Sequence, residues 1–258
     1  MSSHLGVYAA AALYDLAFSY RDFEAETRFV LDAYQRRRGR PAGSLLELAA
    51  GPGRHALAAA AAGVSVTALD LSPEMAAYTR EKAAKADVQL EYVVADMSDL
   101  ALSGTFDLAA CMLCSAGYLL TDAAVLSHLQ GVRGVLATDG LYLLELTHPS
   151  ELSGAPKSKN SWRMADSLGE VQIDWGGDPA KAVAGVFESH VTLEYRPFDG
   201  GPIVRVEDDA RQRAFTFEQF SSLAERAGFA IEAALGGFDE GLALGDPRAQ
   251  RMLLLLSP

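Results

Sequence analysis

The sequence predicts an α/β fold whose mostly parallel sheet is covered by helices on both faces. From residue 44 onward, apolar runs of strand length alternate with helical segments. Such alternation is typical of parallel strands joined by crossover helices. A short glycine loop follows the first apolar run and leads into an alanine-rich helix, in LLELAAGPGRHALAAA. The 258 residues, 50% of them hydrophobic, are enough for one elaborated domain with a buried core.

The order of elements follows from apolar runs and helix starts. Residues 5–38 are expected to be helical, because they hold too many apolar and aromatic side chains for a free tail. Five strands are then predicted at SLLELA, VSVTALD, VQLEYVVAD, TFDLAACML and GLYLLEL, and two more at AIEAAL and RMLLLLS. Ser72 and Pro73 are typical of a helix start. Thr216 and Gln219 have capping-box spacing before the last helix.

Residues 160–215 break this pattern. HVTLEYR alternates apolar and polar side chains, as a half-exposed antiparallel strand does, and VQIDW and IVRVE are similar. We therefore expect a small antiparallel sheet, inserted after the fifth strand at the edge of the site. The chain then divides into an N-terminal helical lid (1–40), a core (41–150), the inserted substrate-side sheet (151–215) and the C-terminal part of the core sheet (216–258).

Composition excludes several classes of protein. A formal net charge of -12 repels phosphate backbones and anionic lipid, so neither nucleic acid nor a membrane is an expected partner. No long apolar run or export signal is apparent, which predicts a cytoplasmic protein. Cys111 and Cys114 are too few for a disulfide framework and are expected to be small buried side chains. No cluster with metal-ligand spacing occurs, so no metal is predicted.

The glycine loop predicts a ligand site. Gly51 and Gly53 let the backbone approach a ligand, and the following helix presents free amides at its positive end. Asp70, at the end of the second strand, is placed to accept hydrogen bonds from a ribose diol. GPGRHA also fits the dinucleotide pattern, so the loop alone leaves a nicotinamide cofactor open. The distinguishing residues are two further acids: Glu47 within the first strand and Asp96 at the end of the third.

These residues resemble the class I S-adenosylmethionine (SAM)-dependent methyltransferases. LLELAAGPGRH is similar to the first motif of that family, ALDLSPEM to its ribose-binding turn, VVADM to its adenine-contacting turn and TFDLAACMLCSAGYL to its fourth-strand motif. The resemblance covers residues 44–148 and, more loosely, the whole chain. YDLAFSY, CMLCSAGYLLTD and RAFTFEQF are most similar to small-molecule N-methyltransferases of the amino-sugar type. Ala49 stands where the family often has glycine, so the loop is expected to lie slightly differently there.

The resemblance implies a Rossmann-like, seven-stranded, mostly parallel sheet with an antiparallel last strand and SAM across the strand ends. Glu47 then lies under the methionine end, and Leu71 and Met75 flank the adenine. Arg54 and His55 open the helix and are either exposed first-turn residues or cofactor contacts. The candidate cofactor-binding residues are Tyr20, Glu47, Ala49, Ala50, Gly51, Gly53, Arg54, His55, Asp70, Leu71, Met75, Ala95, Asp96, Met97, Cys111, Met112 and Leu113.

Methyl transfer asks little of the protein, because a sulfonium methyl is already electrophilic and alignment in a dry pocket provides most of the acceleration. A hydroxyl or an ammonium must lose a proton, whereas a neutral amine needs no strong base. His148, after the fifth strand, is the candidate base; the alternative is a hydrogen-bonded structural residue. Tyr14 and Tyr118, with Tyr20, are candidates to line the acceptor pocket, since aromatic faces favour cations; the alternative is packing.

The sequence thus predicts a SAM-dependent methyltransferase that acts on a small molecule, a secondary metabolite, by direct in-line transfer to N or O. Two alternatives stay open. One is a SAM-binding protein without methyl transfer, and the other is a nicotinamide-dependent oxidoreductase. Neither the acceptor nor the oligomeric state is predicted.

Overall fold

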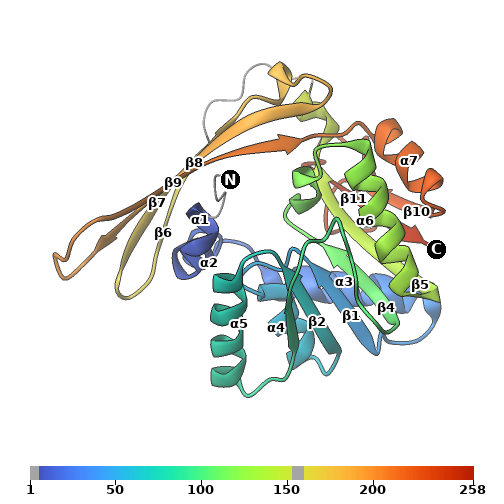
Figure 1. The fold of residues 1–258 in the computed structure, drawn as a ribbon, viewed down its shortest axis with the longest axis horizontal. Helices are drawn as coiled ribbons and strands as arrows, with labels where there is room; N and C mark the ends of the chain where they lie inside the picture. Colours follow the sequence, from blue (N-terminus) through green and yellow to red (C-terminus); the bar gives the residue numbers. More distant parts are fainter. Residues whose placement is uncertain (1–5, 153–159) are drawn as a thin grey trace.

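Two sheets organise the molecule in the computed structural model, which describes residues 6–152 and 160–258 (Figure 1). A seven-stranded sheet forms the core, and a separate four-stranded sheet extends from it. In order across the core sheet, the strands are β10 (Ala230–Leu235), β11 (Arg251–Ser257), β5 (Leu136–Thr147), β4 (Phe106–Cys111), β1 (Ser44–Leu48), β2 (Ser65–Asp70) and β3 (Glu91–Val94).

The core sheet has the predicted direction of strands. β1 pairs in parallel with both β2 and β4, and the parallel pairing continues to β3 on one side and β5 on the other. β11 is antiparallel to both of its neighbours, β5 and β10, which confirms the antiparallel last strand. The strands that follow β1 lie on one side of it (β2 and β3) and then on the other (β4 and β5). Because the strand order reverses between β1 and β4, a crevice forms at the carboxyl ends of these two strands.

Helices cover both faces of this sheet. Leu45 points toward α3 (Phe23–Arg38) and α4 (Arg54–Ala61), where it joins a buried cluster with side chains of both helices. Leu46 points the other way, toward α6 (Asp122–Val135) and α7 (Phe217–Arg226). α5 (Pro73–Ala86) packs against β2 and β3. The period of two along a strand thus gives each face its own core.

The helix starts follow the predicted capping chemistry. The Ser72 hydroxyl accepts a hydrogen bond from the Met75 amide at the start of α5. Thr216 and Gln219 form a reciprocal capping box at the start of α7. Each cap satisfies amides that the first helical turn leaves unpaired, so these short polar side chains set where the helices begin.

The N-terminal segment (residues 6–38) is mainly helical, as expected, and its helices are separated by short interruptions. It forms α1 (Gly6–Ala9), α2 (Ala11–Ala17) and α3, with irregular backbone at residues 18–22. Asp22 caps α3 by accepting a hydrogen bond from the Ala25 amide. Residue 5 lies outside the described residues. No described helix is long and apolar enough to cross a bilayer.

The inserted sheet contains four antiparallel strands: β6 (Asn160–Ala165), β7 (Gly169–Gly177), β8 (Val186–Pro197) and β9 (Val204–Arg213). β7, β8 and β9 correspond to the three predicted strands, and β6 was missed. One face of the sheet packs against α1 and α2, where a buried cluster joins the two parts, with Val7, Ala17, Val171, Ile173, Val191 and Leu193. Three short 3-10 turns complete the connections: η1 (Ser115–Tyr118), η2 (Pro149–Leu152) and η3 (Pro179–Lys181).

Candidate functional site

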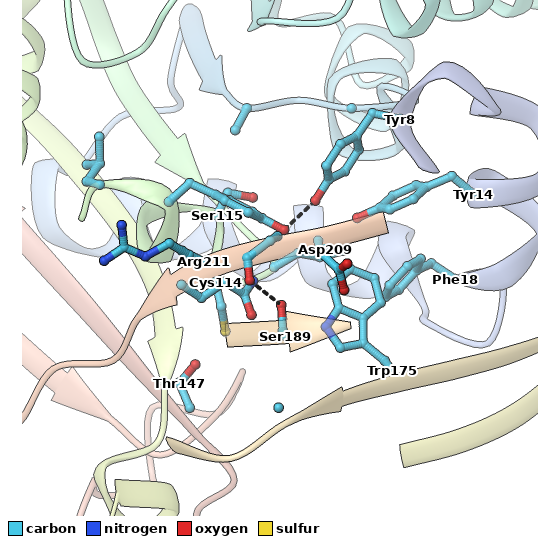
Figure 2. A pocket seen from close by; sticks show the side chains of 18 of the residues that line it. Tyr8, Tyr14, Phe18, Cys114, Ser115, Thr147, Trp175, Ser189, Asp209 and Arg211 are labelled. Carbon is cyan, nitrogen blue, oxygen red and sulfur yellow. Dashed lines mark hydrogen bonds between the residues drawn. The ribbon is translucent and has the colours of Figure 1, made fainter. Parts of the chain in front are cut away.

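A large cavity lies where the carboxyl ends of the parallel strands face the N-terminal segment and the inserted sheet (Figure 2). Its volume is about 1570 Å³. Pockets for a single drug-sized ligand typically enclose about 300–1,000 Å³. The cavity therefore has room for two ligands side by side.

The glycine loop after β1 forms one wall of this cavity. Ala49, Gly51 and Gly53 all have left-handed backbone, with φ of 52°, 53° and 68°. A Cβ at Gly53 would lie 2.3 Å from the Thr79 methyl carbon, so this position requires glycine. Ala49, which stands where a glycine was expected, adopts the glycine conformation at a cost in backbone strain.

Asp70 closes β2 beside this loop. Its Oδ2 accepts a hydrogen bond from the Gly51 amide at 2.8 Å, and its Oδ1 accepts one from the Ser72 amide at 2.9 Å. Burial raises the pKa of Asp70, and the two backbone hydrogen bonds partly offset that rise. An ionised carboxylate has about four acceptor sites, so both oxygens keep capacity for further donors such as a diol.

The next two turns continue the same wall. The side chain of Leu71 is 61% exposed, which is unusual for leucine and leaves an apolar surface free at the cavity. Ala95, Asp96 and Met97 follow β3 and also line it. The Asp96 carboxylate accepts a hydrogen bond from the Ser98 amide at 2.7 Å. An apolar flank beside a carboxylate-bearing turn suits an adenine ring and its edge.

The structure brings part of the predicted site together at the cavity. The residues that line it are Tyr14, Tyr20, Ala49, Gly51, Asp70, Leu71, Ala95, Asp96, Met97, Leu113 and Tyr118. The predicted residues that do not line it are Glu47, Ala50, Gly53, Arg54, His55, Met75, Cys111, Met112 and His148. Met75, Cys111 and Met112 belong to the buried core, and burial raises the pKa of Cys111 to about 12. That thiol is therefore unreactive.

Glu47 and His55 form a buried pair behind the glycine loop. His55 Nδ1 lies 3.2 Å from Glu47 Oε1, and its Nε2 lies 2.9 Å from Glu26 Oε2 on α3. Burial lowers the pKa of His55, but the two carboxylates outweigh burial and raise the pKa to about 9. Glu47 Oε2 is buried and has no hydrogen-bond partner among the described residues. Because Glu47 does not line the cavity, this unpaired oxygen lies behind the loop rather than at the ligand space.

Arg54 fastens the N-terminal segment to the core rather than facing the cavity. Its guanidinium pairs with Asp15 of α2. Asp15 also accepts hydrogen bonds from the Tyr78 hydroxyl at 2.7 Å and from Lys82 at 2.8 Å, both on α5. Sequence reasoning missed Asp15, whose only signal is an acid within an apolar helix. This cluster holds α2 over the glycine loop.

His148 is hydrogen-bonded through both ring nitrogens. Its Nε2 lies 3.1 Å from the Leu244 carbonyl oxygen, which can only accept, so this nitrogen carries the proton. Its Nδ1 lies 2.7 Å from the Ser150 hydroxyl. The ring has no free lone pair directed at the cavity. This geometry favours the structural alternative over a general base.

Aromatic side chains from two parts of the chain form the other half of the cavity, here called the aromatic chamber (Figure 2). Tyr14 and Phe18 come from the N-terminal segment and Trp175 from the inserted sheet. Trp162 of the same sheet also lines the cavity. The Phe18 ring centroid lies 4.7 Å from that of Tyr14 and 5.8 Å from those of both tryptophans. Tyr20 also lines this half. Ring faces of this kind attract cations such as a sulfonium or an ammonium.

A tyrosine pair spans the cavity between its two halves. The hydroxyls of Tyr8 on α1 and Tyr118 in η1 are 2.5 Å apart. Burial raises the pKa of both phenols, so both keep their protons near neutral pH. Sequence reasoning predicted Tyr118 but not Tyr8. Tyr8 and Tyr118 are far apart along the chain, and their contact forms only because α1 docks against the cavity, so the sequence did not predict it.

Comparison with known proteins supports the predicted resemblance. A family model described as a methyltransferase domain matches residues 45–140. The predicted resemblance to the class I SAM-dependent methyltransferases is confirmed. The chain is 27% identical, over 93% of its length and 91% of the relative, to a dTDP-3-amino-3,6-dideoxy-alpha-D-glucopyranose N,N-dimethyltransferase of Streptomyces fradiae.

Solved structures share the fold. A SAM-dependent methyltransferase of Clostridium acetobutylicum superposes with a TM-score of 0.81 at 19% identity, covering 96% of each chain. SAM-bound CalS10, an amino pentose methyltransferase of Micromonospora echinaspora, superposes with a TM-score of 0.73 at 21% identity, covering 95% and 94%. Coverage of this extent includes the N-terminal helices and the inserted sheet as well as the methyltransferase domain.

The methyltransferase domain supplies only half of the cavity. The glycine loop, Asp70 and Asp96 lie within residues 45–140, whereas Tyr14 and both tryptophans lie outside. The flanking segments thus supply most of the other half of the cavity.

Proposed function

We propose that this protein transfers a methyl group from SAM to an amine nitrogen of a small, sugar-like acceptor. The supporting observation is that one cavity joins the glycine loop and Asp70 to the aromatic chamber. SAM bound along the loop would place its sulfonium toward the aromatic chamber, with the acceptor on the far side. The comparisons support this function rather than a nicotinamide-dependent oxidation or SAM binding without transfer.

The residues around the cofactor half fit SAM. Asp70 has acceptor capacity for the ribose hydroxyls, and Leu71 offers an apolar surface to the adenine. When bound, SAM supplies an electrophilic methyl on a positive sulfur. The protein therefore has only to align the acceptor and exclude water.

The aromatic chamber supports an amine as the acceptor. Tyr14, Phe18 and Trp175 present ring surfaces that stabilise the sulfonium before transfer and the methylated ammonium after it. The phenols of Tyr8 and Tyr118 stay protonated and do not act as bases at neutral pH. An amine that arrives neutral needs no strong base, in agreement with these protonation states.

Polar side chains around the aromatic chamber support a sugar-like acceptor. Ser115, Thr147, Asn160 and Gln212 line the same cavity and can exchange hydrogen bonds with hydroxyl groups. The Streptomyces fradiae relative is named for an amino sugar. A small amine with several hydroxyls would use both the rings and these polar groups.

A paired substrate assay tests the proposal. The probe is dTDP-3-amino-3,6-dideoxy-glucose, and its matched control carries a 3-hydroxyl in place of the amine. We expect S-adenosylhomocysteine and an N-methylated product, detected by mass spectrometry, with the amino sugar alone. The rate should rise with pH as the ammonium loses its proton. Methylation of the hydroxyl compound but not of the amine would contradict nitrogen as the acceptor atom.

A further inference from the structure

A buried carboxylate on β5 contacts both the N-terminal segment and the turn at the reacting end of the cavity. Glu145 is fully buried. Its Oε2 accepts a hydrogen bond from the Leu113 amide at 2.7 Å and lies 3.0 Å from Arg21 Nη2. Its Oε1 lies 3.2 Å from Arg21 Nη1 and also pairs with Arg251 of β11. One side chain thus joins three separate segments.

The turn that Glu145 holds has unusual backbone. β4 ends at Cys111, and Leu113 and Cys114 follow with φ of 53° and 57°. Two consecutive non-glycine residues in left-handed conformation persist only where neighbouring groups fix them. Leu113, Cys114 and Ser115 all line the cavity, and Figure 2 shows the last two. Their position therefore shapes the space beside the reacting atoms.

The cation on Glu145 comes from the N-terminal segment. Arg21 lies in the irregular stretch between α2 and α3, directly after Tyr20, which lines the cavity. Its side chain is 5% exposed and also binds Glu26 of α3, at 2.9 Å from Nε to Oε1 and 2.8 Å from Nη2 to Oε2. A buried carboxylate is tolerated where it is paired and hydrogen-bonded. Docking of the N-terminal segment thus completes the surroundings of Glu145.

We propose that Glu145 is a positioning residue for methyl transfer: it holds the Leu113–Cys114 turn in its reactive geometry when Arg21 docks against it. The turn is then correctly placed only when the N-terminal segment has closed over the cavity. This proposal rests on the proposed function for its effect on turnover. The coupling between Arg21, Glu145 and the turn does not depend on the identity of the acceptor.

The chain contains its own reporter of closure. Its two tryptophans, Trp162 and Trp175, both contact Phe18 of the N-terminal segment, and the Trp162 indole donates a hydrogen bond to the Ala17 carbonyl at 2.8 Å. Undocking of the segment exposes both indoles to water. Tryptophan emission therefore measures closure without any acceptor.

The test compares Arg21→Gln and Glu145→Gln with wild type. In the protein without cofactor, both variants should shift tryptophan emission to longer wavelength. With saturating SAM and the amino-sugar probe, kcat should fall about tenfold or more, because small misplacements of the reacting groups are costly. The KM for SAM should change by less than about threefold, since neither Arg21 nor Glu145 lines the cavity and the lost interaction reaches SAM only through the turn.

Two further variants keep the result interpretable. Arg36 lies on α3, the same helix as Glu26, but away from the cavity, and it forms an exposed ion pair with Glu240. Arg36→Gln removes this pair and should match wild type in emission and kcat. Arg21→Lys keeps the charge but loses the forked geometry that spans both carboxylates, so its kcat should fall between wild type and Arg21→Gln. If Glu145→Gln does not fold, Arg21→Lys still tests the coupling.

Two results would overturn the proposal. A loss confined to SAM affinity, with kcat unchanged at saturation, would mean that Arg21 acts through cofactor binding. Unchanged emission together with unchanged kcat in Arg21→Gln would show that Arg21 is needed neither for docking of the N-terminal segment nor for placing the Leu113–Cys114 turn. Failure of the wild-type protein to methylate the probe would instead contradict the proposed function, and the emission of the variants would still decide the coupling.

Discussion

Two acidic residues at the strand ends, Glu47 and Asp70, have different surroundings. Both are carboxylates at the carboxyl edge of the sheet. Glu47 is paired with His55 and keeps one unpartnered oxygen, whereas Asp70 is held by two backbone amides beside the cavity. Asp70 therefore keeps acceptor capacity at the cavity, whereas Glu47 lies behind the glycine loop.

Ala49 gives a prediction about stability at this scale. It is a non-glycine residue with φ of 52°. Left-handed backbone costs such a residue about 1–2 kcal/mol, and glycine costs about 0.5–1 kcal/mol in chain entropy. Ala49→Gly should therefore raise the free energy of unfolding by about 0.5–1 kcal/mol, measured by urea denaturation. Ala50→Gly, without a positive φ to relieve, should lower it; a loss in both variants would contradict the strain.

At the scale of elements, His55 joins three of them. It lies in the first turn of α4 and bridges Glu26 on α3 to Glu47 on β1, so the N-terminal segment and the core sheet share one ionic contact. Arg21 extends the contact to Glu145 on β5. The elements around the cofactor are therefore fixed to one another by buried charges as well as by apolar packing.

This ionic contact predicts how stability depends on pH. The pKa of His55 is about 9 in the folded protein and near 6.5 in an unfolded chain. The folded state then holds the proton more tightly, so the contribution is complete below about pH 6.5 and is lost as pH rises through about 9. The protonated His55 contributes up to about 3 kcal/mol to the free energy of unfolding.

Urea denaturation from pH 6 to 10 measures the effect. Between pH 6.5 and 9 the wild-type protein should lose more stability than His55→Gln, which has no titrating ring. Parallel pH dependence in the two proteins would show that the protonated bridge does not contribute.

At the scale of the whole molecule, the core was predictable, whereas the half of the cavity formed by the flanking segments was predictable only in part: Tyr14, Tyr20 and Tyr118 line the cavity as expected. The glycine loop, Asp70 and Asp96 follow strands within a local motif, so their spacing along the chain gave their place in space. Tyr8, Phe18 and Arg21 enter the site through contacts with segments about a hundred or more residues away, such as Tyr118 and Glu145. Local patterns do not encode such pairings.

His148 shows the same limit. Its position after the fifth strand correctly placed it near the carboxyl edge of the sheet. The carbonyl of Leu244, in the segment before β11, accepts a hydrogen bond from one ring nitrogen of His148. No sequence pattern around residue 148 predicts that contact. Strand order gives the edge on which a side chain lies, but tertiary contacts determine whether it faces the cavity.

The central claim, a SAM site built by the glycine loop and Asp70, is tested most directly by calorimetric titration with SAM. Wild type should bind SAM and give no binding heat with NAD. Asp70→Ala should keep its circular dichroism spectrum and lose about 1.5–3 kcal/mol of binding free energy, the scale for hydrogen bonds to a charged group. Asp32→Ala, an exposed acid on α3, is the matched control and should bind like wild type. Equal affinity of Asp70→Ala and wild type for SAM would contradict the claim.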